Sequence, residues 1–430
     1  MKDGNAPVIT GIGLISALGI GKNTNWQSMV KGKSGIRPIT RFDTSNMMTK
    51  IAGELPGCFE DVANAKLRPI TRKRTAHFTQ LALVGAMEAL EDSGLDFHRE
   101  DRERVGVILG NCMGGMEYLE TLFRSFARQH IGRNVEEEAL TNAVWQGMES
   151  LAGLKFMQNA MTAQIAIDHG IYGPNMVIST ACAAGGMAVE IAADYIRRGT
   201  LDIVITGGAE IFVTGAGQMS FSKLTALSIR NDDPQRAIKP FDKNRDGTIL
   251  GDGAGILILE SQGHASKRGV PIYAKVRGCA SNCEGYSLAI PEPSGEKMAA
   301  VMKMALKNAQ VAPDQIDYLS AHGTATPQND RAEAAAVHLV FKEHAKKLPV
   351  SSQKSMIGHT VGAAGAIELA VTAMSLCKGI ITPNINYETP DPACDLNIVA
   401  NEAQEREMRF AASNSFALGG HNSCIILEKA

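Results

Sequence analysis

The feature that most constrains the fold is an order of elements that occurs twice along the chain. In each copy a short apolar strand runs into a loop of glycine and polar residues, at 110–115 (GNCMGG) and at 321–326 (AHGTAT). A second strand then leads into a helix of small residues, at 179–185 (STACAAG) and at 358–365 (GHTVGAAG). Each copy closes on a glycine turn and a strand, at 253–260 and at 421–428. This repetition predicts an internal duplication, with halves at residues 1–262 and 263–430.

Length and composition agree with two fused α/β units. A single core stops growing beyond roughly 250–300 residues, and this chain has 430 residues, of which 44% are hydrophobic. Short apolar runs that alternate with helical patterns indicate an α/β fold with buried strands. The predicted strands are residues 8–12, 105–109, 176–179, 202–206, 256–259, 272–276, 318–321, 348–351 and 424–427, and the clearest helices are 78–90 and 298–306. Extra length in the first half, with polar residues 128–142, predicts an excursion over the surface.

Charge and cysteine usage exclude several classes of function. A formal net charge of −2 lacks the basic footprint of nucleic-acid binding. The sequence has no secretory segment and no uncharged apolar run of about 18 residues, the length typical of a membrane span. Its eight cysteines form no pair of CxxC motifs with zinc spacing, which predicts reduced thiols and no metal. We therefore expect a cytoplasmic protein without nucleic-acid or membrane partners.

Cys182 differs from the other cysteines in its position. It follows an apolar strand and opens a run of small residues that can start a helix. Backbone N–H groups and the helix dipole at such a terminus favour the thiolate, the reactive form of cysteine. The same N–H groups can form part of an oxyanion hole. Elsewhere a buried structural thiol would be the default interpretation; here the position favours a nucleophile.

Two histidines occupy matching places in the second half. His322 ends a strand in a glycine and threonine loop, and His359 lies at a strand-to-helix junction like that of Cys182. Ligands of α/β proteins bind at such strand ends. Lys354 precedes His359 closely enough to tune its titration, although a solvated lysine is the simpler alternative. We interpret five other histidines as surface or core residues: His98, His130, His264, His338 and His344.

Four motifs, in order, resemble those of the β-ketoacyl-acyl carrier protein synthases. They are 179–182 (STAC), 321–326 (AHGTAT) followed by Asn329 and Asp330, 354–359 (KSMIGH) and 414–420 (NSFALGG). The likeness is closest to the synthase II branch and spans nearly the whole chain. It implies a thiolase-like duplicated α/β fold with five layers, α-β-α-β-α. It also implies a homodimer, or a heterodimer with a chain-length factor.

The resemblance assigns roles to residues of this sequence. Cys182 would take the acyl chain from a carrier-protein thioester, a covalent step that divides the reaction in two. His322 and His359 would hydrogen-bond the thioester oxygen of malonyl-acyl carrier protein during decarboxylation. Lys354 would support both histidines electrostatically. The backbone N–H groups of Cys182 and Leu418 would form the oxyanion hole.

Further residues would support substrate binding. Glu368 and Asp330 would organise the catalytic network, and Thr324 and Thr326 would bind the phosphopantetheine arm. Acyl carrier protein would deliver both substrates, and no metal or redox cofactor is implied. The residues expected to line the acyl pocket are Met113, Phe221, Phe416 and Leu418.

Some positions depart from the family pattern. Leu418 stands where the family carries a gate phenylalanine, and Ala417 replaces a glycine. Thr225 takes a place where synthase II enzymes often carry arginine. Basic residues that could dock an acidic carrier protein, or simply face solvent, are Lys66, Arg68, Arg72, Lys73, Arg74 and Lys223.

Alternative functions follow from the same residues. The separation of Cys182 and His322 is compatible with a papain-like cysteine hydrolase, but the flanks lack that family's signature and a second histidine would have no role. A chain-length factor is disfavoured because its nucleophilic cysteine is typically replaced. Between fatty-acid elongation and a specialised polyketide or polyene pathway, Leu418 and Thr225 shift the interpretation slightly towards the second.

Overall fold

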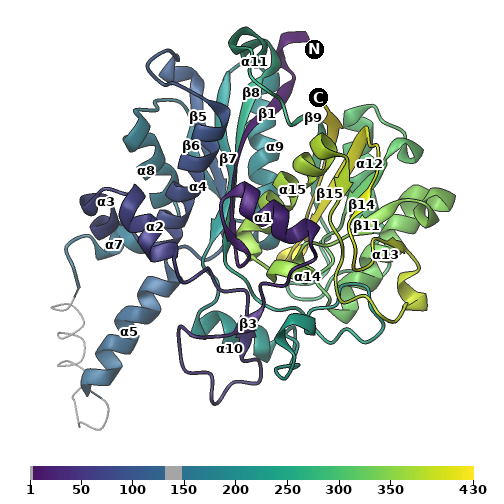
Figure 1. Cartoon of the computed structure of the whole chain (residues 1–430), viewed down its shortest axis with the longest axis horizontal. Coiled ribbons are helices and arrows are strands. Elements are labelled where there is room, and N and C mark those ends of the chain that lie inside the picture. The colour runs from purple at the N-terminus through teal and green to yellow at the C-terminus, as the bar shows by residue number, and fades with distance from the viewer. Residues whose placement is uncertain (1–2, 131–147) are drawn as a thin grey trace.

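The computed structural model describes residues 3–130 and 148–430, which fold around a large mixed sheet (Figure 1). In these ranges the strands are β1 Pro7–Ser16, β2 Gly19–Ile20, β3 Arg37–Pro38, β4 Ile51–Ala52, β5 Val105–Gly110, β6 Asn175–Ile178, β7 Ile203–Glu210, β8 Gly253–Ser261, β9 Ala274–Cys283, β10 Tyr318–Ser320, β11 Pro349–Ser351, β12 Ile380–Ile381, β13 Asn397–Ile398, β14 Gln404–Glu405, β15 Phe410–Phe416 and β16 His421–Lys429. The predicted excursion at residues 128–142 lies outside the described residues from residue 131 onward.

Helices cover the sheet and connect its strands. They are α1 Lys22–Val30, α2 Phe59–Lys66, α3 Pro69–Arg74, α4 His77–Ser93, α5 Met116–His130, α7 Ala152–Phe156, α8 Ala160–His169, α9 Ala184–Arg197, α10 Gly215–Lys223, α11 Gln262–Arg268, α12 Glu296–Ala309, α13 Pro327–Phe341, α14 Lys354–Ile357 and α15 Ala364–Lys378. Three short 3-10 turns contribute to the site: η3 Ala181–Ala183, η7 Val361–Ala363 and η9 Leu418–Gly420.

The sheet contains the same pattern of strands twice. In the first half the order is β1-β8-β7-β5-β6, and in the second it is β9-β16-β15-β10-β11. In the first half β8 pairs antiparallel with β1 and β7, and β5 pairs parallel with β7 and β6. In the second half β16 pairs antiparallel with β9 and β15, and β10 pairs parallel with β15 and β11. The duplication expected from the sequence is therefore present. An antiparallel pairing of β1 with β9 joins the two half-sheets into one sheet, which the sequence did not predict. The division after residue 262 falls at the start of α11 and stays a prediction.

The predicted strands and helices coincide with observed ones, and among the described residues β15 is the one strand longer than two residues that was not predicted. All nine predicted strands overlap β1, β5, β6, β7, β8, β9, β10, β11 and β16, and both predicted helices overlap α4 and α12. The sequence analysis did not predict β15, whose residues FAASNSF are buried throughout. Small and polar residues in a strand that is covered on both faces give no apolar run to recognise.

Two helices lie between the half-sheets and complete the five layers. The central helix α9 packs on β5 and β7, while α15 packs on β8 and β15 and against α9. Outside them, α4 covers β1 and β8, and α12 covers β9 and β16 (Figure 1). The two central helices touch so closely that a Cβ added to Gly185 would lie 2.9 Å from the Cβ of Ala366. The expected thiolase-like layering is confirmed.

The central helix of the second half is apolar enough to resemble a membrane span. The stretch Val361–Lys378 has a mean hydropathy of 1.3, but 89% of it is buried inside the fold. Its composition follows from its place in the middle layer, where both sides face apolar sheet surfaces.

Candidate active site

The site forms where the parallel strands of both halves end. Cys182 lies in η3, which joins β6 to α9, and the matching turn η7 joins the β11 segment to α15. In both turns the first residue is a non-glycine in the left-handed region, Ala181 at φ 48° and Val361 at φ 45°. Such backbone costs about 1–3 kcal/mol and is concentrated at functional sites. The repeated fold thus presents two similar helix starts side by side, with Cys182 at one of them.

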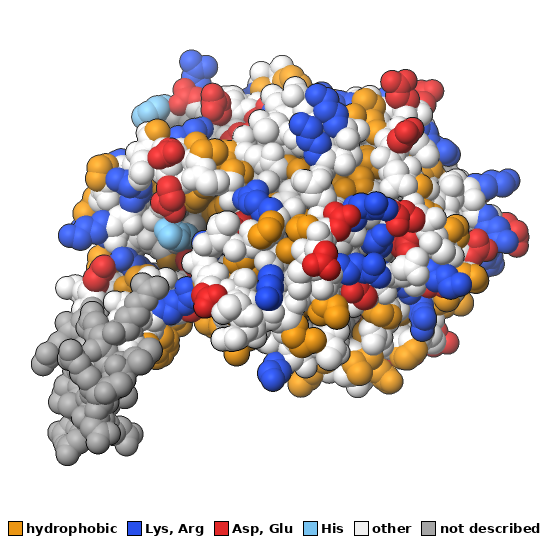
Figure 2. All heavy atoms as spheres, turned by 60° about the horizontal axis from the view of Figure 1, so that its bottom comes forward, with side chains coloured by type: hydrophobic (Ala, Val, Ile, Leu, Met, Phe, Trp, Pro, Cys, Tyr) orange, Lys and Arg blue, Asp and Glu red, His pale blue; other side chains and the backbone are white. Residues whose placement is uncertain are grey.

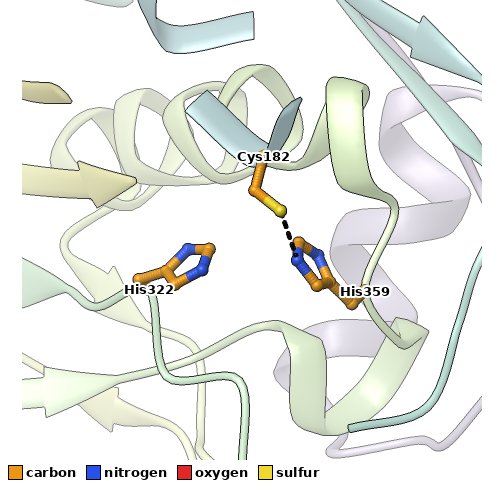
Figure 3. A group of neighbouring side chains, drawn as sticks. All are labelled: Cys182, His322 and His359. Carbon is orange, nitrogen blue, oxygen red and sulfur yellow. Dashed lines mark hydrogen bonds between the residues drawn. The ribbon is translucent and has the colours of Figure 1, made fainter. Parts of the chain in front are cut away.

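The structure brings the predicted cysteine and both histidines together (Figure 3). His359 Nε2 lies 3.0 Å from Cys182 Sγ. The rings of His322 and His359 are 5.4 Å apart and nearly perpendicular. All three side chains are buried, with at most 3% of their surface exposed. The three residues therefore surround a small enclosed volume at the sulfur atom.

Hydrogen bonds on the far side of each ring assign the imidazole tautomers. Lys354 Nζ lies 3.3 Å from His322 Nδ1, and the Val361 N–H lies 3.3 Å from His359 Nδ1. An ammonium and an amide only donate, so each Nδ1 accepts and the ring proton is assigned to Nε2. Both histidines then present an Nε2–H donor towards the space beside Cys182.

Burial keeps both imidazoles neutral. It lowers the pKa of His322 and of His359 well below the ordinary value, and the charge of Lys354 lowers the pKa of both further. The site consequently offers two uncharged hydrogen-bond donors at neutral pH.

The thiol of Cys182 differs from the sequence-based expectation. Burial raises the pKa of Cys182 to about 12, against the opposing effects of Lys354 and of backbone N–H groups. The predicted stabilisation of a thiolate at the helix start is therefore outweighed by desolvation, and the empty site holds a neutral thiol.

Lys354 is a fully buried cation with several partners. Its Nζ donates to the backbone oxygen of His322 at 2.7 Å and to a carboxylate oxygen of Glu368. Burial raises the pKa of Glu368 to about 7, while the nearby Lys354 opposes this shift. The two predicted supporting residues thus form one buried ion pair behind His322.

The backbone around Leu418 faces the cysteine. The N–H of Leu418 and the N–H of Cys182 itself both lower the pKa of the Cys182 thiol, so both lie near its sulfur. Gly419 and Gly420 form this turn with φ angles of 83° and 77°, which favour glycine. The two amides predicted as the oxyanion hole therefore converge on one point.

A cavity of about 420 Å³ leads from this point to the surface. Thr324 and Thr326 line it, with their hydroxyl oxygens 2.9 Å apart, as do Phe416 and Leu418. Asp330 does not touch the imidazoles; it accepts N–H bonds from Phe241 and Ala325 and holds the loop that carries the two threonines.

The predicted acyl-pocket residues divide into two groups. Met113 and Phe221 pack in one apolar cluster with Cys182, and the same cluster contains Phe212. The rings of Phe212 and Phe221 meet edge to face, 5.2 Å apart. Phe221, together with Phe416 and Leu418, lines the cavity that leads to the surface.

Among the predicted docking residues only Lys223 lines the cavity. Lys66 ends α2, and Arg68, Arg72, Lys73 and Arg74 lie in or next to α3. Arg68 pairs with Asp168 of α8. Figure 2 shows lysine and arginine side chains interspersed with acidic and hydrophobic ones on the face that it presents. Charge pairing on that face is therefore local.

The spacing of Cys182, His322 and His359 would also suit a metal ion, since one potential ligand atom from each lies within 4.8 Å of the others. A metal at Nε2 would move each ring proton to Nδ1. There the proton would face Lys354 Nζ or the Val361 N–H, which are themselves donors. Ligating histidines normally find an acceptor at this position. The donor set thus disfavours a metal, and the absence of a metal cofactor stays a prediction.

Two buried glutamates at the site were missed by the sequence analysis. Glu333 of α13 accepts the N–H groups of His322 and Gly323, both at 2.8 Å, and so fixes the loop of the first histidine. Glu210 ends the apolar strand β7 and accepts N–H groups from the loop that carries Met113. A charged residue at the end of an apolar strand is the signal that could have identified Glu210.

Comparisons with known proteins agree over the full chain. Family models described as the N-terminal and C-terminal domains of beta-ketoacyl synthase match residues 6–265 and 273–388. A 3-oxoacyl-[acyl-carrier-protein] synthase 2 of Coxiella burnetii is 38% identical over 422 residues, which is 98% of both chains. The corresponding Staphylococcus aureus protein is 38% identical over 430 residues, covering 100% of this chain and 99% of that protein.

Solved structures include close matches from polyketide systems. One contains a type II polyketide synthase acyl-carrier protein in complex with its ketosynthase bound to the hexaketide; the matching chain has a TM-score of 0.88 and 31% identity. Another is the ishigamide ketosynthase/chain length factor, with a TM-score of 0.88 and 32% identity. In both comparisons 99% of this chain and 99% of the other are covered.

Proposed function

The chain belongs to the β-ketoacyl synthase family, and we propose that Cys182, His322 and His359 carry out its condensation. As a member of this family it is an acyl-transferring enzyme that performs a Claisen condensation, in which an acyl thioester and malonyl-acyl carrier protein give a β-ketoacyl-acyl carrier protein. The family explains the pairing of Cys182 with His322, so the alternative of a papain-like hydrolase is no longer needed. The observation that carries the residue assignment is the convergence of one thiol and two neutral Nε2–H donors.

In the first half-reaction the acyl group moves to Cys182. The sulfur attacks the thioester carbonyl, a new C–S bond forms, and the bond to the carrier sulfur breaks. The thiol proton leaves with the departing carrier thiol, so the step is balanced. Charge on the carbonyl oxygen is stabilised by the N–H groups of Cys182 and Leu418, and the effect of both groups on the pKa of the Cys182 thiol supports this assignment.

In the second half-reaction malonyl-acyl carrier protein loses carbon dioxide. The electron pair of the broken C–C bond moves onto the thioester oxygen, where the Nε2–H groups of His322 and His359 stabilise the enolate. Because these imidazoles are neutral, they donate hydrogen bonds without readily transferring a proton. The enolate carbon then attacks the acyl group on Cys182, the C–S bond breaks, and the sulfur leaves as a thiolate that takes a proton from water. Decarboxylation supplies the electrons of the new bond, so the step needs no redox cofactor.

Substitution of Cys182 tests this division of labour. We expect Cys182→Ala to abolish condensation of acyl- and malonyl-acyl carrier protein. We expect Cys182→Gln to keep decarboxylation without condensation, because its amide oxygen can occupy the oxyanion hole as an acyl group would. Unchanged product formation by Cys182→Ala would disprove the assignment of the nucleophile. Loss of decarboxylation in a folded Cys182→Gln protein would disprove the independent role of the histidines.

The substrate arm is proposed to enter through the cavity beside Thr324 and Thr326. Their hydroxyl groups line the path to Cys182 and offer hydrogen bonds to the amides of phosphopantetheine. The relatives named for fatty-acid synthesis favour elongation of fatty acids, while the polyketide ketosynthases of similar structure keep a specialised pathway as the second candidate. Mass spectrometry of the acyl chain on Cys182, isolated from the native host, would distinguish them by its length and unsaturation.

Carrier docking and a second subunit complete the proposal. We assign docking to Lys223 at the mouth of the cavity, with the α3 cluster as a second basic contact.

For the subunit partner, strand β6 ends the sheet order and its residues 176–178 are only half-buried. A second copy, or a chain-length factor, could extend the sheet there. Sedimentation of the purified chain alone would separate a homodimer from an incomplete heterodimer. A cytoplasmic location remains part of this proposal.

A further inference from the structure

Glu210 is a fully buried carboxyl group that the reaction described above does not use. It ends β7, and none of its surface is exposed. Its Oε2 accepts the Cys112 N–H at 2.6 Å, and its Oε1 accepts the Met113 N–H at 3.2 Å. The Asn111 Nδ2 donates to the same Oε1 at 3.2 Å. The carboxylate thus fixes the loop that brings Met113 to the acyl side of Cys182.

The same carboxylate also holds the second half of the chain. Gly362 lies against it, and its backbone N–H lowers the pKa of Glu210 against the effect of burial. A Cβ at Gly362 would lie 2.4 Å from Glu210 Oε2 and 2.7 Å from the Cys112 nitrogen, so the contact requires glycine. Gly362 is the middle residue of η7, and its neighbour Val361 donates to His359 Nδ1.

The duplication explains why an anion belongs at this place. Gly362 in η7 corresponds to Cys182 in η3, since both are the second residue of a turn that begins with a left-handed non-glycine. The backbone N–H of Cys182 is the one proposed above to bind the reacting carbonyl oxygen. At the equivalent Gly362 the carboxylate of Glu210 lies against the backbone. The start of a helix favours an anion in both turns, but only the helix start at Cys182 is available to the substrate.

We propose that Glu210 is a positioning residue that ties the Met113 loop to the η7 turn and thereby fixes the imidazole of His359. The proposal rests on the role assigned above to His359. It explains why, within residues 3–130 and 148–430, the hydrogen bonds to Glu210 come from amides of the Met113 loop: each carboxylate oxygen accepts N–H donors, so no cation is needed.

Glu210→Gln tests the proposal directly at a pH above about 8, where the Glu210 carboxyl group is ionised in the fold. The new NH₂ group must face N–H donors, either those of Cys112 and Gly362 or those of Met113 and Asn111. We expect decarboxylation, measured in the Cys182→Gln background, to fall by up to about a hundredfold, as for a misplacement of about 1 Å. The KM for malonyl-acyl carrier protein should stay unchanged, because the mouth of the cavity is not affected. We also expect an altered preference for acyl length in the loading of Cys182.

Matched variants separate positioning from stability. Glu117 is a half-buried carboxyl group that accepts the Phe78 N–H at the start of α4, so Glu117→Gln controls for loss of a nearby acid. Glu210→Asp keeps both acceptor oxygens and should recover part of the activity. If Glu210→Gln does not fold, Gly362→Ala displaces the same carboxylate from the other side and should give the same phenotype.

Nitrogen NMR of labelled histidine gives a readout that is independent of activity. In the parent protein both imidazoles should carry the proton on Nε2. Glu210→Gln should mix the tautomers of His359 but leave His322, which is held by Lys354, as an internal control. Unchanged His359 signals would overturn the proposal, as would losses of rate that Glu117→Gln reproduces. If the parent protein itself did not condense its substrates, the proposed function would be wrong. The NMR comparison would still test the positioning role of Glu210.

Discussion

Lys354 is the cation on which the chemistry of the two histidines depends. Its ammonium group lowers the pKa of both imidazoles and, through His322 Nδ1, determines which nitrogen of that ring carries the proton. A neutral imidazole stabilises an enolate by donating a hydrogen bond. An imidazolium would also protonate the enolate, so the decarboxylated malonyl group would be released without condensing. The buried charge thus protects the intermediate as well as orienting the donor.

Lys354→Met should therefore change both rate and titration. Without the ammonium the Nε2–H tautomer of His322 is no longer enforced, so we expect decarboxylation to fall by about 10²-fold, as for loss of one oxyanion donor. The pKa of His322 should rise towards its ordinary value, because one of the effects that lower it is removed, while burial still holds it below that value. Rate assays and NMR titration of His322 measure the two effects.

The exposed Lys347 offers a control for loss of a lysine charge. Lys347→Met should leave the rate and the His322 titration as they are in the parent protein. A Lys354→Met protein that folds and keeps the parental rate would contradict the role given to this cation.

The sequence predicted the residues proposed to react and part of the network that supports them, but not Glu333 or Glu210. Cys182, His322 and His359 lie in motifs whose types and positions indicate their chemistry. Glu333 and Glu210 act on backbone N–H groups, which every residue type except proline can supply. Glu210 bonds to Cys112, which is 98 residues away. Partners of this kind become visible only when the fold brings strand ends together. The burial that raises the pKa of Cys182 was missed for the same reason.

At the scale of elements, the turn η9 connects the oxyanion hole to the edge of the cavity. The Glu284 N–H donates to the oxygen of Gly420, and the Gly419 N–H donates to the oxygen of Leu288. Both glycines have positive φ angles. The position of the Leu418 amide is therefore set by a turn that only glycine allows, bonded to the loop that lines the mouth of the cavity.

Gly420→Ala should displace this amide. At φ 77° an alanine costs about 1–2 kcal/mol of backbone energy, and its Cβ would lie 3.1 Å from the Cβ of Glu284. We expect a loss of stability of that size and a fall in kcat of up to about a hundredfold. Thermal unfolding and steady-state kinetics measure the two effects separately.

Gly269 provides the matched control for Gly420→Ala. It has a φ of 67° at the end of α11, and an added Cβ would meet nothing within 4 Å. Gly269→Ala should lower stability by a similar amount without changing kcat. Equal kinetic effects of the two substitutions would show that the Leu418 amide is not held by this turn.

The elements that the sequence predicted best are those with apolar runs between turn signals. Residues 105–109 and 256–259 are buried and apolar, and they form β5 and β8. In contrast, β15 carries Asn414 and Ser415 into the core, where Asn414 Nδ2 contacts the sulfur of Met302 and the carboxylate of Glu333. The duplication could have identified a strand at this place, because β7 holds the equivalent position in the first half.

At the scale of the whole molecule, the junction of the two halves contains acids that burial affects strongly. Burial raises the pKa of Glu210 to about 8, and raises the pKa values of Glu117, Glu333 and Glu368 to about 7. Active-site geometry thus depends on carboxyl groups whose charged form is costly in the fold. Backbone N–H donors and Lys354 offset part of this cost.

The free energy of unfolding should consequently fall as the pH rises from about 5 to about 8. The ordinary glutamate pKa is 4.5, so over this window the folded chain keeps protons that the unfolded chain has lost. Stability decreases with pH wherever the folded state binds more protons, by about 1.4 kcal/mol per pH unit for each proton. His322 and His359 have the opposite effect on the free energy of unfolding below their ordinary pKa of 6.5. The contribution of two histidines is smaller than that of four acids.

Denaturant unfolding at a series of pH values and at one protein concentration measures this slope, because association would otherwise shift the apparent stability. Glu117→Gln removes one of the four acids without touching the reacting residues, so its slope should be smaller by one proton between pH 4.5 and about 7. A parent stability that is flat or that rises over the window would show that the N–H donors and Lys354 outweigh burial. The acids would then be ionised in the fold, and their negative charges would stabilise the junction.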